Sequence, residues 1–308
     1  MGPTASGKTA LAFAMADRFP VELISVDSAQ VFKDMNLGTA KPDTATLARY
    51  PHHLIDIITP EESYSAARFC TDVLPLMADI VARGKVPLLV GGTMLYYKAL
   101  MDGLADLPQA DPALRAEIDE QAVRLGWPAL HAELGRLDPE TAARLAPNDS
   151  QRIQRALEVV RLTGQPMSTL YAAQKKNPLP YQTLALGLAP TERSWLHQRI
   201  AERFDLMLKA GLVDELVLLR KQYQLHIGLP SMRSVGYRQV WDYLEGKMPQ
   251  NELRDRGIFA TRQFAKRQLT WFNTLSMVEL HDCADPATQT RLLEKTERFI
   301  AANAASLT

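Results

Sequence analysis

The apolar side chains of the first hundred residues follow two alternating patterns. Apolar residues three and four positions apart predict a helix soon after the start of the chain and another over residues 63–83, kinked or interrupted near Pro75. Short apolar runs over residues 21–26 and 87–90 predict buried strands. The apolar positions of the first helix are Leu11, Ala12, Met15, Ala16 and Phe19. Strands that alternate with helices predict an α/β fold with a parallel sheet core flanked by helices.

The pattern changes in the middle of the chain. Residues 105–180 show helical patterns only, separated by prolines and glycines, and we predict an inserted all-helical domain there. Residues 1–104 would form the first part of the core, and residues 181–308 would complete it and add C-terminal helices. Residues 181–188 predict a return to the sheet, and the chain after Thr191 is again mostly helical.

The composition is ordinary for a globular protein, with 46% apolar and 23% charged residues among 308. The 35 basic and 35 acidic residues balance, so net charge neither requires nor excludes a nucleic-acid partner, but basic residues cluster over residues 151–161 and 254–267. Cys70 and Cys283 form no metal or disulfide pattern, which is typical of a reducing compartment. Without a signal peptide or a long apolar run, we expect a cytoplasmic monomer that does not bind membranes.

The sequence GPTASGKT near the start of the chain matches the phosphate-binding loop G-x-x-x-x-G-K-[ST] at every fixed position. Gly2 and Gly7 let the backbone turn its N–H groups toward an anion, Lys8 adds a positive charge, and Thr9 offers a hydroxyl to a phosphate-bound Mg²⁺. The helix that follows directs the positive end of its dipole at the same anion. Because such a loop normally follows a buried strand, we expect an apolar strand upstream in the native protein.

The ends of the two predicted strands supply candidate catalytic side chains. Asp27 follows the first strand, at the edge where open parallel sheets bind ligands, and could act as a general base. Its alternative role is to cap the next turn. Thr93 follows two glycines after the second strand, where it can bind a ligand, begin a helix, or do both.

A basic helix lies inside the predicted insertion. The sequence Asn148-Asp149-Ser150 predicts its start and Gly164 its end, with the helix over residues 151–163. Polar side chains three or four positions apart can act together on a phosphate backbone, or they can form an ordinary solvated surface. These side chains are Gln151, Arg152 and Arg155, and the predicted buried stripe is Ile153, Leu157 and Val160.

Arg199 and Arg203 lie four positions apart on a later predicted helix. Two arginines on one helical edge suit a pyrophosphate held from the side opposite the phosphate loop. Ion pairs with Glu202 or Asp205 are the alternative.

Two further stretches have a composition suited to RNA. Residues 230–239 combine two arginines, a tyrosine and a glycine, which could stack on a base and hold its phosphates, although such aromatics often lie in a core. Residues 262–272 predict an amphipathic helix with a basic edge. His52 and His53 have no third ligand at metal spacing, so we expect them to be structural.

Together these stretches resemble the tRNA dimethylallyltransferase (tRNA isopentenyltransferase) family, from residue 2 to about residue 272. The resemblance rests on GPTASGKT, ISVDSAQVF, GTAKP, PHHLID, LLVGGTMLYYKAL, PNDSQRIQRALEV, RFDLML, SVGYRQ and TRQFAKRQLTWF, in this order. It implies a P-loop NTPase-like core and transfer of a dimethylallyl group from dimethylallyl diphosphate to N6 of the adenine 3′ of the anticodon. Eukaryotic relatives carry a C-terminal zinc finger, which the single Cys283 in this region cannot build.

The resemblance also implies roles for individual residues. Asp27 would accept the proton of the adenine amine, Thr93 would orient the donor or the adenine, and the adenine would leave its stack to react. The diphosphate would be held with Mg²⁺ by Gly2, Pro3, Thr4, Ala5, Ser6, Gly7, Lys8, Thr9 and Arg203, with Thr9 as the metal ligand. The residues implied to contact the tRNA anticodon stem-loop are Asp27, Ser28, Ala29, Gln30, Thr93, Arg115, Gln151, Arg152, Ile153, Gln154, Arg155, Arg233, Ser234, Val235, Gly236, Tyr237 and Arg238.

Three other functions compete with this interpretation. A small-molecule kinase would need an adenine-binding segment, which the sequence does not reveal. A prenyltransferase for free adenine nucleotides would have no use for a helical insertion with arginines. A non-catalytic RNA-binding protein would have no use for an intact phosphate loop.

Overall fold

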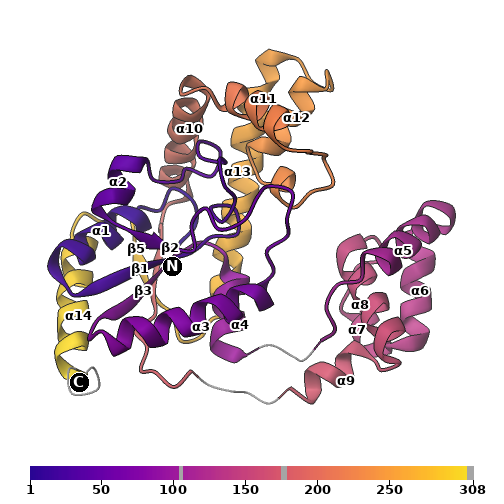
Figure 1. The fold of residues 1–308 in the computed structure, drawn as a ribbon, viewed down its shortest axis with the longest axis horizontal. Coiled ribbons are helices and arrows are strands. Elements are labelled where there is room, and N and C mark those ends of the chain that lie inside the picture. Colours follow the sequence, from indigo (N-terminus) through magenta and orange to yellow (C-terminus); the bar gives the residue numbers. More distant parts are fainter. Residues whose placement is uncertain (104–106, 175–178, 304–308) are drawn as a thin grey trace. The chain divides into compact units, whose positions relative to one another are not determined.

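The computed structural model describes residues 1–103, 107–174 and 179–303. The chain divides into two compact units (Figure 1). We call Met1–Leu100 with Leu179–Thr308 the core unit, and Met101–Pro178 the helical unit. No helix in the described part of the chain is both long and apolar enough to cross a bilayer.

A three-stranded parallel sheet forms the first part of the core unit. Its strands are β1 (Val21–Val26), β2 (His52–His53) and β3 (Val86–Gly91), in the order β2-β1-β3. The two predicted strands are confirmed, whereas β2 was not predicted because two histidines carry no strand pattern. Since β1 and β3 run parallel with Val26 opposite Gly91, the residues after both strands meet at one edge of the sheet.

A second parallel pair joins β4 (Leu186–Ala189) to β5 (Glu279–Asp282). The prediction of a strand over residues 181–188 is therefore only partly right: the strand begins at Leu186, and its partner among the described strands is β5 rather than a strand of the first sheet. The pairing was not predicted because β5 is short, and half of it is exposed. Met1 lies beside β4, with its amino group donating to the Leu186 carbonyl (2.7 Å) and its carbonyl accepting from the Leu188 N–H (2.9 Å).

Several helices lie near the two sheets. They are α1 (Lys8–Arg18), α2 (Thr44–Arg49), α3 (Ala66–Ala82), α4 (Met94–Asp102) and α14 (Thr288–Ala302). All of these except α2, which has no buried residue, bury apolar side chains. The predicted interruption of α3 is absent: the helix continues through Pro75, whose ring is exposed. The stripe of α3 that stays buried, Phe69, Val73, Met77 and Ile80, outweighs the backbone hydrogen bond that proline removes.

The rest of the core unit is helical, as predicted after Thr191. Its elements are α10 (Arg193–Lys209), α11 (Leu212–Gln222), η1 (Ser231–Arg233), α12 (Tyr237–Leu244) and α13 (Gln250–Phe272). At Gly257 of α13, an added Cβ would lie 1.9 Å from the Phe204 ring of α10. Glycine therefore allows these two helices to approach closely, and both line the cavity described below.

The helical unit has its own apolar core. Its helices are α5 (Pro112–Leu125), α6 (Trp127–Leu137), α7 (Pro139–Ala143), α8 (Ser150–Thr163) and α9 (Met167–Ala172). The predicted ends of α8 are confirmed, because the Asp149 carboxylate accepts from the Arg152 N–H and Gly164 ends the helix with φ 69°. The fully buried side chains of this core are Ile118, Leu130, Leu134, Ile153, Ala156 and Leu157.

Candidate active site

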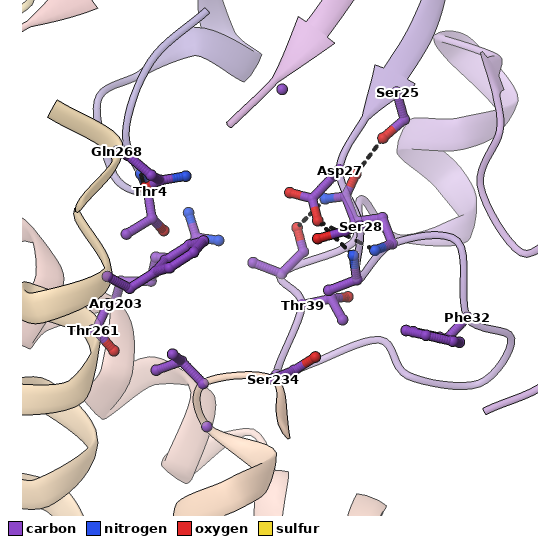
Figure 2. A pocket seen from close by; sticks show the side chains of 18 of the residues that line it. Thr4, Ser25, Asp27, Ser28, Phe32, Thr39, Arg203, Ser234, Thr261 and Gln268 are labelled. Carbon is purple, nitrogen blue, oxygen red and sulfur yellow. Dashed lines mark hydrogen bonds between the residues drawn. The ribbon is translucent and has the colours of Figure 1, made fainter. Parts of the chain in front are cut away.

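A cavity of about 390 Å³ opens at the carboxyl edge of the first sheet, within the core unit. Its lining comes from the segment before α1, the turn after β1, residues 38–42, α10, residues 230–236 and α13. Figure 2 shows Arg203 and Gln268 on one side of this cavity and Asp27 and Ser28 on the other. The topology thus brings together segments from both ends of the chain.

The GPTASGKT segment adopts a tightly wound loop. Gly7 has φ 90°, a conformation that glycine adopts without strain, and Ala5 also has a positive φ of 63°. An added Cβ on Gly2 would lie 2.4 Å from Ser6 Oγ, so the first glycine is required for close packing. Ser6 Oγ is buried and has no hydrogen-bond partner within the described structure. The Ser6 hydroxyl could therefore form a hydrogen bond with an anion bound in the loop.

Lys8 lies in the cavity with its side chain half-buried, and its ammonium donates to the Pro3 carbonyl (3.2 Å). The pKa of Lys8 is lowered to about 8, mainly by burial and also by the positive charge of Arg203, while the negative charge of Asp27 opposes both effects. Arg203 also lines the cavity, and burial is the largest cause of its lowered pKa. Two cations held partly out of water and close to each other make this region favourable for an anion.

Two side chains from distant helices hold the backbone of this loop. Gln268 Oε1 accepts from the Thr4 N–H (2.9 Å), and its Nε2 donates to the Gly92 carbonyl (2.8 Å). Arg199 Nε donates to the Ala5 carbonyl (2.9 Å). Of the two predicted arginines, therefore, Arg203 lines the cavity and Arg199 supports the loop. Gln268 lies in the quoted motif TRQFAKRQLTWF, but its role was missed because no local pattern relates it to residues 264 positions away.

Asp27 makes the turn contacts that were considered as its alternative role. Its Oδ1 accepts from the Ala29 N–H (2.9 Å) and, at 3.4 Å, from the Gln30 N–H. The same carboxylate lines the cavity, and its charge acts on Lys8 and Arg203. Capping and a chemical role are therefore compatible, since a carboxylate oxygen can accept several hydrogen bonds.

Thr93 lies against the turn that follows Asp27. Its Oγ1 accepts from the Ser28 N–H (2.9 Å) and lies 3.3 Å from Ser28 Oγ. Its own N–H donates to the Val26 carbonyl (3.2 Å), which fixes the residue at the end of β1. Gln30 is tied down as well, because its amide accepts from Ser25 Oγ (3.0 Å) and donates to the Ala40 carbonyl (3.4 Å). The turn at residues 27–30 is thus rigidly held.

Residues 233–236 line the cavity as well, but Tyr237 does not. Its side chain is 0% exposed, and its hydroxyl donates to Glu215 Oε1 (2.5 Å). The prediction that this tyrosine stacks on a base is therefore wrong, because it lies on the buried face of α12. Arg238, one position later, is exposed and pairs with Asp242 (3.4 Å).

Within the helical unit, Glu158 organises the arginines that were predicted to contact RNA. Glu158 is 0% exposed, and its oxygens pair with Arg115 Nε (2.8 Å) and Arg155 Nη1 (2.6 Å). Arg152 is largely exposed and pairs with Asp149 (2.7 Å).

The other predicted side chains of α8 differ in exposure. The Gln154 amide donates to Asp119 Oδ1 (2.7 Å), and Gln151 is exposed. Ile153 lies in the core, so its side chain cannot contact RNA, contrary to the prediction.

His52 and His53 belong to β2, and both make contacts within the protein, while His52 also lines the cavity, so its structural role stays a prediction. His53 Nε2 lies 3.0 Å from Glu22 Oε2, and His52 Nδ1 lies 2.6 Å from the Tyr50 carbonyl. Burial is the largest cause of the lowered pKa of His52, which favours the neutral ring.

Comparison with known proteins gives consistent matches along almost the whole chain. The family model described as IPP transferase matches residues 30–275. The chain is 65% identical over 300 residues to the tRNA dimethylallyltransferase of Dechloromonas aromatica, covering 97% of this chain and 96% of the relative. It is 61% identical over 283 residues to the enzyme of the same name from Thiobacillus denitrificans, covering 92% and 90%.

Solved structures agree with these matches. The full-length tRNA isopentenylpyrophosphate transferase of Bacillus halodurans is 37% identical, with a TM-score of 0.69 and coverage of 99% of this chain and 95% of that one. A eukaryotic dimethylallyltransferase, solved while acting on tRNA, is 28% identical, with a TM-score of 0.80 and coverage of 99% and 78%.

Proposed function

Because the chain belongs to the IPP transferase family, we propose that it transfers a dimethylallyl group from dimethylallyl diphosphate to N6 of the adenine on the 3′ side of a tRNA anticodon, releasing diphosphate. The main support for the proposal is that one cavity is lined by the phosphate loop and Arg203 on one side and by the Asp27 carboxylate on the other (Figure 2). A group that binds a diphosphate and a group that accepts a proton are the two parts that this reaction requires.

The donor would bind with its diphosphate in the phosphate loop. Lys8 and Arg203 offer positive charge there, and the Ser6 hydroxyl could donate to a phosphate oxygen that completes its hydrogen bonding. The amino end of α1 adds the positive end of a helix dipole. The remaining members of the proposed diphosphate site are Gly2, Pro3, Thr4, Ala5, Gly7 and Thr9.

The residues of the cavity fit a phosphate-bound Mg²⁺. The structure offers no cluster of three or more acidic, histidine or cysteine ligands among its described residues, so the protein would supply few ligands. Mg²⁺ commonly keeps several waters and binds through one or two protein oxygens plus substrate phosphates, and the Thr9 hydroxyl in the cavity could provide such an oxygen. When bound, the ion would neutralise charge on the leaving diphosphate.

In the proposed reaction the adenine N6 attacks C1 of the dimethylallyl group. The N6–C1 bond forms as the C1–O bond breaks, and the bonding electrons leave with the diphosphate. The N6 proton passes to the Asp27 carboxylate, whose position is fixed by the Ala29 and Gln30 N–H groups. Lys8 and Arg203 stabilise the negative charge that grows on the leaving group.

Thr93 would orient the reactants beside Asp27, since its hydroxyl is already held by Ser28. Residues 28–30 and 233–236 would contact the extruded base and its neighbours. In the helical unit, Arg115, Gln151, Arg152, Gln154 and Arg155 would bind the phosphate backbone of the stem-loop. Arg152 has a more exposed side chain than Arg115 or Arg155, which both pair with Glu158. It is therefore the arginine of these three that is best placed to exchange its carboxylate partner for a phosphate.

Incubation with labelled dimethylallyl diphosphate, Mg²⁺ and unmodified anticodon stem-loop RNA tests the proposal. We expect label on the RNA, and loss of that label when the adenine beside the anticodon is replaced by guanine. Parallel reactions with free AMP and with γ-labelled ATP plus a metabolite pool test the two enzymatic alternatives. Label transferred only to AMP, or only from ATP to a small molecule, would contradict the proposed substrate.

A further inference from the structure

We propose that Glu215 is a positioning residue that fixes the shape of the acceptor side of the cavity without touching the substrate. The inference rests on the proposed function and concerns how the adenine side of the same site is built. We call residues 38–40 and 233–236, which line the cavity, the acceptor wall. We call residues 2–9, the phosphate loop, the donor wall; its members Thr4, Lys8 and Thr9 line the cavity.

Glu215 of α11 binds one edge of the acceptor wall through consecutive backbone N–H groups. Its carboxylate accepts from Asn36 (3.1 Å), from Leu37 (2.9 Å to Oε2 and 3.1 Å to Oε1) and, at 3.4 Å, from Gly38. Three successive N–H groups directed at one anion impose a curved backbone that few other partners could hold. The conformation of residues 36–38 therefore depends on a side chain 177–179 positions later.

The same carboxylate reaches the other edge of the acceptor wall through Tyr237. The Tyr237 hydroxyl donates to Glu215 Oε1, and its ring packs so closely on Gly38 that an added Cβ there would lie 2.4 Å from the ring. A Cβ on Gly236 would lie 3.9 Å from Gly38. Residues 38–40 and 233–236 are thus joined at one tyrosine–carboxylate pair, in which Tyr237 is buried and Glu215 is half-buried.

The polar groups near this junction are mostly used within the protein. Thr39 is buried, and its hydroxyl donates to the Met35 carbonyl (2.7 Å), while the Ala40 carbonyl accepts from Gln30. Ala40 has φ 47°, a conformation that costs energy for alanine and persists only where neighbouring contacts enforce it. The acceptor wall is consequently rigid, and we expect it to select a base by how well that base fits its fixed shape.

The donor wall is held by other residues. Gln268 and Arg199 bond its backbone, and neither bonds to Glu215 or Tyr237. A defect at Glu215 should therefore weaken the acceptor side selectively. A residue that only stabilised the fold would affect both substrates alike.

Steady-state kinetics of Tyr237→Phe and Glu215→Gln test the inference, with Glu245→Gln as the control at an exposed carboxylate of the same region. We expect the KM for stem-loop RNA to rise about tenfold in Glu215→Gln and a few-fold in Tyr237→Phe, as removal of one charged or one neutral hydrogen-bond partner predicts. The KM for dimethylallyl diphosphate should stay within about twofold. Tyr237→Phe keeps the buried ring, so it preserves folding if Glu215→Gln does not.

Amide hydrogen exchange of residues 36–38 gives a readout that needs no catalysis. We expect faster exchange in Glu215→Gln than in the wild type and in Glu245→Gln. Unchanged exchange, or faster exchange with an unchanged KM for RNA, would overturn the inference, as would an equal rise of both KM values. A wild-type protein that labels no RNA would instead overturn the proposed function, so the two failures are distinguishable.

Discussion

The two walls of the cavity are built in different ways. The donor wall is one continuous segment, residues 2–9, whose own glycines, lysine and hydroxyls determine most of its shape. The acceptor wall combines two segments far apart in sequence and depends on Glu215, which lies outside both. A diphosphate needs charge and N–H groups, which a short motif supplies, whereas a base in one particular RNA requires a shaped surface. Substitutions can test separately how the donor wall binds the diphosphate and how the acceptor wall binds the RNA base.

The largest effect is expected at Asp27, which faces the cavity opposite Arg203 (Figure 2). Asp27→Ala removes the proposed base and should lower kcat by about 10² to 10⁴. Asp27→Asn, which keeps an oxygen for the Ala29 N–H, should lose similar activity while preserving the turn. Single-turnover rates with saturating RNA and donor measure the chemical step. A variant that keeps this rate and loses only RNA affinity would exclude the role of base.

Lys8→Ala should damage the donor wall alone. Removing a charge from the leaving diphosphate should lower kcat/KM for the donor by about 10² to 10³, as for other groups that stabilise developing charge. RNA affinity, measured by fluorescence anisotropy without donor, should remain that of the wild type. Lys209→Ala, at an exposed end of α10, is the control. A matching loss of RNA affinity would mean that the walls are not independent.

Gln268→Leu tests whether the donor wall needs its distant support. The change removes the bonds to the Thr4 N–H and the Gly92 carbonyl; the Thr4 N–H loses this partner, whereas the Gly92 carbonyl keeps its bond from the Met94 N–H (3.1 Å). We expect the KM for dimethylallyl diphosphate to rise about tenfold, a size typical of one lost buried polar partner. Gln263→Leu, on the exposed face of the same helix, should have no effect. Equal kinetics for the two variants would show that the loop holds its shape unaided.

The smallest effect is a pH dependence of donor binding. With a pKa of about 8 in the free protein, Lys8 is charged below that pH and loses its charge as the pH rises through it. The KM for dimethylallyl diphosphate should therefore rise above pH 8, by at most about tenfold per pH unit. Lys8→Arg should remove this rise, because arginine stays charged. The KM for RNA serves as an internal reference over the same pH range.

Predictions from sequence succeeded where a structure is specified by neighbouring residues. The strands at residues 21–26 and 87–90 and the ends of α8 at Asp149 and Gly164 follow from local apolar patterns and capping chemistry. Tyr237 was misassigned because an aromatic residue in a basic segment has the same sequence signature whether it faces a base or a core. Glu215 and Gln268 gave no signal, since their partners lie 177–179 and 264 residues away, respectively.

The support of the phosphate loop by α10 and α13 also bears on how the protein is made. The loop is synthesised before its backbone partners, Arg199 and Gln268, which follow 194 and 264 residues later. Such distant contacts form late in folding, because the intervening chain must first be ordered. Dimethylallyl diphosphate should therefore bind only after α10 and α13 have been translated, and binding would then stabilise α13 together with the phosphate loop.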